Sequence, residues 1–133
     1  MRLKETEEWN VFTGKQYGHT AKKEARVTLG HYGTFYLNRQ AFTELGSAAA
    51  VELLFDQGRR RIGLRPVPHM APHAFKIVQH TRGGYHRLSA AAFCHHYGIF
   101  HKGTLLFHDI RIDDNGMMRL DLVNTTVVSR GAR

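Results

Sequence analysis

The sequence has few of the residues that crosslink a chain or anchor it in a membrane. Its single cysteine, Cys94, excludes an intramolecular disulfide and fits a reducing compartment. Met1 is followed by Arg2, Lys4 and Glu5 rather than by an apolar segment, so we expect no signal peptide. No apolar run approaches the ~18 residues that a membrane-spanning helix needs. We therefore expect a cytoplasmic protein that makes no membrane contact.

Acidic residues are also scarce, because 11 Asp and Glu stand against 19 Lys and Arg in 133 residues. The formal net charge is +8 and the sequence pI is about 10.1. Such an excess favours nucleic acid, an acidic protein or an anionic membrane as a partner. Residues 1–66 carry 11 basic and 7 acidic residues, and residues 67–133 carry 8 and 4, so each half contributes +4. No charged tail explains the excess, and the alternative is a soluble basic protein without a polyanionic partner.

The three prolines are confined to one stretch, Pro66, Pro68 and Pro72. This predicts a linker at 67–74 between two units, 27–66 and 75–123. Residues 1–26 are then an N-terminal extension and residues 124–133 a C-terminal tail. The apolar fraction of 42% is ordinary for a folded chain.

A short module occurs twice in the chain. Residues 33–42 and 84–93 share Gly, Leu and Ala-Phe at an offset of 51, and Leu-Leu-Phe at 53–55 recurs at 105–107 with one residue inserted. A repeated unit of this size usually cannot bury its apolar face alone. We therefore expect the two copies to pack on each other as a pseudo-dimer. The alternative is two similar patterns that arose by chance in one mixed α/β domain.

Each copy predicts the order β-β-α-β-β. Asn38 is a good cap for a helix over 39–45, and Ser89 for a helix over 90–97. Gly58 predicts a hairpin turn, and the Asn115-Gly116 pair predicts one of type I′ geometry. The expected strands are 27–29, 34–37, 51–55 and 60–65 in the first copy, and 75–78, 85–88, 104–107 extending to 112, and 117–122 in the second.

The stretch Gly33-Thr34-Phe35-Tyr36-Leu37, the helix at 39–45 and the hairpin from Val51 to Pro66 resemble the AbrB/MraZ/SpoVT swapped-hairpin family. The resemblance covers 27–66 well and 75–122 more loosely. The family usually has Leu-Pro at the helix start, where this chain has Leu37-Asn38 and Leu88-Ser89. The resemblance implies an α+β fold in which two β-β-α-β-β units form an intertwined pseudo-dimeric β-barrel. It also implies duplex DNA binding and possible homo-oligomers.

By the same resemblance, DNA is approached from loops and strands near the start of each unit. Arginine suits phosphate because its planar fork donates two parallel hydrogen bonds. The first hairpin adds three arginines to these candidates. The second hairpin has Asp113-Asp114 at the matching place, which argues against a phosphate contact at both hairpin tips. The alternative is that the hairpin arginines are exposed charges that only interact with water. The candidate DNA-binding residues are Lys22, Lys23, Arg26, Arg59, Arg60, Arg61, Arg82 and Arg87. The implied role is a transcriptional regulator or antitoxin-like protein, and the alternative is a non-catalytic protein-interaction or assembly module.

Ten histidines are many for this length, and the densest group is Cys94-His95-His96 with His101. It lacks a standard zinc spacing, so we expect no metal site and no cofactor. No catalytic motif is present, and Cys94 falls on a buried helix face, so we expect no enzyme. Among the aromatic residues, Phe35 is a predicted core residue, whereas Tyr32 and Tyr36 fit either packing or stacking on bases.

Overall fold

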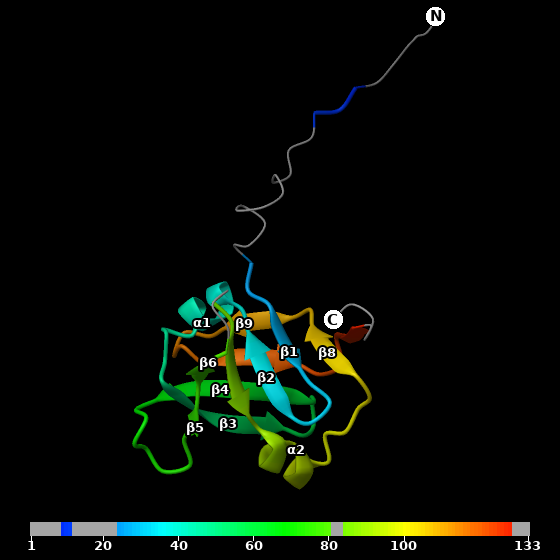
Figure 1. Cartoon of the computed structure of the whole chain (residues 1–133). Coiled ribbons are helices and arrows are strands. Elements are labelled where there is room, and N and C mark those ends of the chain that lie inside the picture. The colour runs from blue at the N-terminus through cyan, green and yellow to red at the C-terminus, as the bar shows by residue number, and fades with distance from the viewer. Residues whose placement is uncertain (1–8, 12–23, 81–83, 129–133) are drawn as a thin grey trace, which may run out of the picture.

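A computed structural model describes residues 9–11, 24–80 and 84–128. These residues form two antiparallel sheets and two short helices (Figure 1). The six strands of sheet A are, in spatial order, β11 (Thr125–Val128), β8 (Thr104–Phe107), β1 (Val27–Leu29), β2 (Thr34–Leu37), β7 (His86–Ser89) and β6 (Val78–Gln79). The five strands of sheet B are β5 (Phe75–Lys76), β3 (Ala50–Asp56), β4 (Arg61–Val67), β10 (Met118–Asp121) and β9 (Ile110–Ile112).

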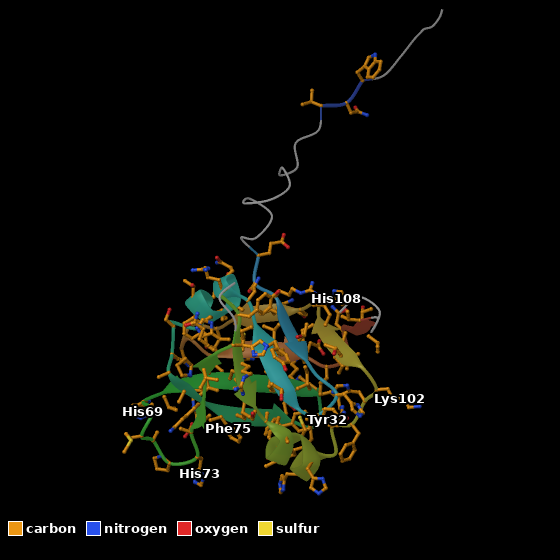
Figure 2. The ribbon with its side chains drawn as sticks, in the orientation of Figure 1. Tyr32, His69, His73, Phe75, Lys102 and His108 are labelled. Carbon is orange, nitrogen blue, oxygen red and sulfur yellow. The ribbon has the colours of Figure 1, made fainter. Side chains whose placement is uncertain are left out.

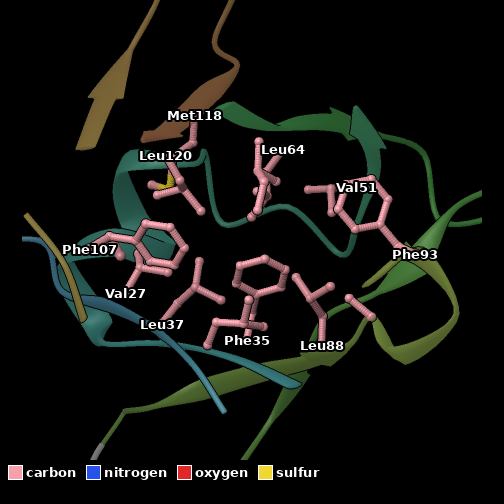
Figure 3. Close-up of a cluster of buried hydrophobic side chains, with 14 of the residues drawn as sticks. Val27, Phe35, Leu37, Val51, Leu64, Leu88, Phe93, Phe107, Met118 and Leu120 are labelled. Atoms are coloured by element: carbon pink, nitrogen blue, oxygen red, sulfur yellow. The ribbon is translucent and has the colours of Figure 1, made fainter. Parts of the chain in front are cut away.

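The core fills the space between the two sheets (Figure 3). Successive side chains of a strand point to opposite faces of its sheet, so one in two points inward. The burial patterns of β1 and β2 follow this alternation, and Phe35 is fully buried, as the sequence predicts. Sheet A contributes Val27, Phe35, Leu37 and Leu88 to the core, and sheet B contributes Val51, Leu64, Met118 and Leu120.

The two helices close opposite ends of the sandwich (Figure 1). Helix α1 (Arg39–Glu44) begins at Asn38, whose side-chain oxygen accepts from the backbone N–H groups of Ala41 and Arg26, both at 2.9 Å. Helix α2 (Ala91–Tyr97) begins differently. The predicted Ser89 cap is wrong: Ser89 ends β7, and Ala90 occupies the cap position without a side-chain hydrogen bond.

Close packing on a glycine takes the place of that cap. The Ala90 backbone N–H donates to the Gly33 carbonyl at 2.7 Å. A Cβ on Gly33 would lie 2.8 Å from the Ala91 Cα, and Gly33 has a φ of +90°. The second copy repeats the arrangement, since Gly84 has a φ of +95° and lies against the Arg39 side chain at the start of α1. Each helix therefore docks on the turn glycine of the other copy.

Both sheets are shared between the two halves of the chain. In sheet A, β1 pairs with β8 and β2 pairs with β7; in sheet B, β3 pairs with β5 and β4 pairs with β10. The β2–β7 ladder sets Tyr36 opposite Arg87, two positions that differ by the repeat offset of 51. In each sheet, an adjacent pair of strands from the first half, β1–β2 or β3–β4, is thus flanked on both sides by strands from the second half.

Four further expectations differ from the structure. The implied closed barrel is not present among the described strands, which form two sheets with separate edges. The strand expected over 104–112 breaks at His108-Asp109, and the strand expected over 75–78 breaks at Ile77, because the chain crosses there from one sheet to the other. Part of the predicted tail, Thr125–Val128, is the edge strand β11.

Neither described helix could cross a membrane, since the longer one has seven residues.

Candidate nucleic-acid interface

The outer face of sheet B pairs its positive charges with negative ones. The guanidinium of Arg65 lies 2.6 Å from the Glu52 carboxylate, its cross-strand neighbour. Three further arginines follow the same pattern on neighbouring strands and turns. These ion pairs are Arg59–Asp56 at 3.4 Å, Arg111–Asp109 at 2.8 Å and Arg119–Asp113 at 3.2 Å. A face with this balance offers little net attraction to a polyanion.

The predicted hairpin arginines, Arg59, Arg60 and Arg61, all belong to this side of the molecule. The Arg60 guanidinium lies 5.4 Å from the centre of the Phe55 ring, as a cation–π pair. In register, Arg61 stands between Asp56 and Asp121 of the two neighbouring strands. Arg59 and Arg60 are therefore engaged by neighbouring groups of the protein, whereas Arg61 has acidic residues only as its neighbours in register.

Sheet A is different, because none of the residues in its six strands is acidic. In β1, β2 and β7 the buried inward residues are apolar, and the outward residues are Thr28, Thr34, Tyr36, Arg87 and Ser89. One outward row can be followed through the register of all six strands. It consists of Thr126, Leu106, Thr28, Tyr36, Arg87 and Val78.

Tyr36 and Arg87 form the middle of this row. Tyr36 is half-buried on the outer face, and its ring meets the His80 ring edge-on at 5.2 Å between centroids. Tyr36 therefore lies outside the buried core, and its ring has a packing contact with His80. Arg87 is half-buried directly opposite Tyr36. A guanidinium beside a phenol gives this face both a charged and a neutral hydrogen-bond donor.

Arg26 lies two residues before Thr28, and strand alternation therefore places it on the same outer face. It is exposed and lines a hollow of about 520 Å³ together with Asn38, Tyr85 and His108. Glu24 also lines this hollow and is the one acidic group there. His108 marks one end of the sheet, and Tyr32 and Lys102 mark the other end (Figure 2).

Five of the eight predicted binding residues are described by the structure, and they lie on two different sheets. Arg26 and Arg87 belong to sheet A, and Arg59, Arg60 and Arg61 to the β3–β4 hairpin of sheet B. Lys22, Lys23 and Arg82 lie outside the described residues. Thr28 and His108 also lie on or beside this face, and the sequence did not single them out; for Thr28, its place between buried Val27 and Leu29 was a usable signal.

The Cys94–His101 segment does not converge on a common point. Cys94 is buried, and that burial raises the pKa of its thiol. The His95 ring meets Phe100, the His96 ring meets Tyr97, and His101 Nδ1 lies 3.1 Å from the Gly103 carbonyl oxygen. Within the described part of the chain, no group of three His, Cys, Asp or Glu side chains is placed to hold a metal ion.

Comparison of the chain with protein-family models, with curated proteins and with solved structures finds no match.

Proposed function

We propose that this protein binds duplex DNA through the outer face of sheet A, as a transcriptional regulator or antitoxin-like protein. The observation that supports this most directly is the absence of acidic residues from all six strands of sheet A, beside the ion-paired outer face of sheet B. Arg26 and Arg87 are the phosphate-binding residues among those described. Lys22, Lys23 and Arg82 are further contacts predicted from the sequence.

The chemistry of the face fits a phosphate backbone. Guanidinium groups supply charge-assisted hydrogen bonds, and the hydroxyl groups of Thr28 and Tyr36 supply neutral donors, as in many DNA backbone contacts. The pairing of strands across the two halves fits a tandem pair of swapped-hairpin units, in line with the family resemblance of residues 27–66. We extend the proposal to a cytoplasmic protein that binds DNA as a monomer or homo-oligomer.

The test is fluorescence anisotropy of a labelled random-sequence duplex at low and near-physiological salt. Binding should weaken steeply with salt, because each neutralised phosphate contributes a slope of roughly −0.9 in log K against log salt. The double variant Arg26→Gln/Arg87→Gln should lose at least about tenfold in affinity and reduce the slope by up to about 2.

The matched control is Arg65→Gln/Arg111→Gln, which removes the same charge from the ion-paired face of sheet B. Its affinity should stay within about threefold of the unmodified protein. Equal losses in the two double variants would show that net charge alone governs binding. No binding by the unmodified chain at low salt would refute DNA binding altogether.

The second candidate is a protein-interaction module, and the exposed aromatic residues at one end of the molecule favour it. Tyr32 is 84% exposed and Phe100 is 72% exposed. A hydrogen-bond contact of 2.9 Å from His31 Nδ1 to the His101 carbonyl oxygen holds the two loops together. Aromatic anchors with adjacent basic residues such as Lys102 suit an acidic protein partner. A stable complex with an acidic protein, without duplex affinity, would favour this alternative.

A further inference from the structure

A second concave site lies on sheet B, away from the proposed DNA-binding face. It is a hollow of about 580 Å³ over β3, β4 and the start of β10. Leu54, Gly63 and Met117 provide apolar and backbone surface, and Arg59, Arg61 and Arg119 line the hollow with guanidinium groups. We propose that this hollow binds a small organic anion, with a carboxylate or sulfonate head and a compact apolar body.

Gly63 is the residue that makes the hollow. It lies inside β4 with its partner Leu54 on one side and Arg119 on the other. A glycine within a strand weakens it and often marks a close approach of another group. Here a Cβ on Gly63 would lie 2.9 Å from the Met117 sulfur and 3.6 Å from the Leu54 Cβ. The missing side chain lets Met117 lie across the strand.

Met117 is suited to give way to a ligand. Its unbranched thioether side chain has three rotatable bonds and adapts to irregular surfaces, which is why methionine is common at adaptable binding sites. A compact apolar group that displaces the Met117 side chain would contact the Gly63 backbone and the Leu54 side chain. The apolar part of the ligand can therefore be no thicker than the space that the Met117 side chain now occupies.

The charge of the lining selects an anion. Arg59, Arg61 and Arg119 line the hollow, Asp56 is the one acidic residue in its lining, and Arg119 pairs with Asp113 outside it. Arg59 shares its charge with Asp56 over 3.4 Å, and both side chains are largely exposed. Among the described residues, the Arg61 side chain has no hydrogen-bond or ion-pair partner. An anion near Arg61 would gain charge-assisted hydrogen bonds.

The surroundings of the hollow argue for a small molecule over a polyanion. Asp109 and Asp121 lie beside Arg61 and Arg119 in the adjoining hollow, and Asp113 pairs with Arg119. A chain of phosphates that followed this face would meet these carboxylates, whereas a compact anion that stays within the hollow avoids them. The volume falls in the range of roughly 300–1,000 Å³ typical of small-molecule sites.

The test is an NMR titration of the full ¹⁵N-labelled chain with naphthalene-2-carboxylate and, separately, with octanoate, at up to about 10 mM. An affinity in the millimolar range or better is the expected result. The largest shifts should fall on the amides of Arg61, Gly63 and Met117. Naphthalene-2-carboxamide, which has the same body without the charge, should bind at least about tenfold more weakly.

Two variants make the result specific to the site. Arg61→Gln should weaken the carboxylate at least about fivefold, and Arg65→Gln, on the same strand and face but outside the hollow, should leave its affinity unchanged. An unchanged spectrum away from the substitution shows that each variant is folded. The proposal is overturned by no shift with either acid, by equal affinity for the carboxamide, or by an Arg61→Gln variant that binds as the unmodified chain does.

Discussion

Gly33 shows how one residue can fix the position of a helix. Its positive φ turns the chain between β1 and β2, and its missing side chain lets the backbone of α2 approach. The Gly33 carbonyl then accepts the hydrogen bond from Ala90 that begins the helix. A side chain would be unfavourable for two separate reasons, the left-handed backbone and the contact with Ala91.

Replacement of Gly33 by alanine should therefore destabilise the protein by about 2–4 kcal/mol. The control is Gly46→Ala, because Gly46 has a φ of +78° but nothing lies within 4 Å of its added Cβ. Gly46→Ala should lower the free energy of unfolding only through backbone strain, by about 1 kcal/mol. Urea unfolding followed by circular dichroism measures both, and equal losses would contradict the role of the Ala91 contact.

At the scale of elements, the β9–β10 hairpin depends on a carboxylate. Asp113 accepts from the backbone N–H groups of Asn115 at 2.9 Å and Met117 at 3.0 Å, and it pairs with Arg119. The hydrogen bond from Met117, followed by that from Asn115 and by Arg119, lowers the pKa of Asp113 below its ordinary value of 3.8. The Asn-Gly pair does mark the turn, but Gly116 has a positive φ and Asn115 does not, so the turn is not of type I′.

A lowered pKa means that the Asp113 charge stabilises the fold above pH 3.8, and that this contribution disappears as pH falls through the lower folded value. Asp113→Asn should therefore be less stable than the unmodified chain near pH 7, and the difference should shrink towards about pH 2. Urea unfolding at the two pH values measures it. Asp114→Asn is the control, since the Asp114 carboxylate accepts no hydrogen bond from another described residue. If the stability difference between Asp113→Asn and the unmodified chain did not change with pH, the Asp113 charge would not be what stabilises the hairpin.

At the scale of the whole molecule, the two halves depend on each other for backbone hydrogen bonds and for the core. Four ladders join the halves, and the β4–β10 ladder alone spans four residue pairs, from Met118↔Leu64 to Asp121↔Arg61. Separation of the halves would expose Phe35 and Leu88, which face each other across β2 and β7. Unpaired strand edges and exposed core residues are both unfavourable in water.

Accordingly, fragments 1–68 and 72–133 should not fold alone, and an equimolar mixture should regain a cooperative thermal transition. Circular dichroism and amide proton dispersion report on each fragment and on the mixture, with the intact chain as reference. A dispersed spectrum and a cooperative transition from either fragment as an isolated monomer would show that the halves are independent domains.

The sequence by itself determined most of the local structure. The sequence patterns placed β1 and β2 and identified Phe35 as a core residue, and Asn38 and the hairpin turns placed α1, β3 and β4 within a residue or two. These features depend on neighbours along the chain, which local patterns report. Ser89 failed as a cap because the packing of α2 on Gly33, a contact between distant segments, positions that helix instead.

Only the tertiary structure decided which strands are neighbours and which face each charge occupies. Alternation gives two faces to a strand but does not say which sheet it joins, so the crossings at Ile77 and at His108-Asp109 were not visible in the sequence. Arg61 and Arg87 look equivalent along the chain. Strand register sets one between Asp56 and Asp121 and the other beside Tyr36, and register is a property of pairs of strands.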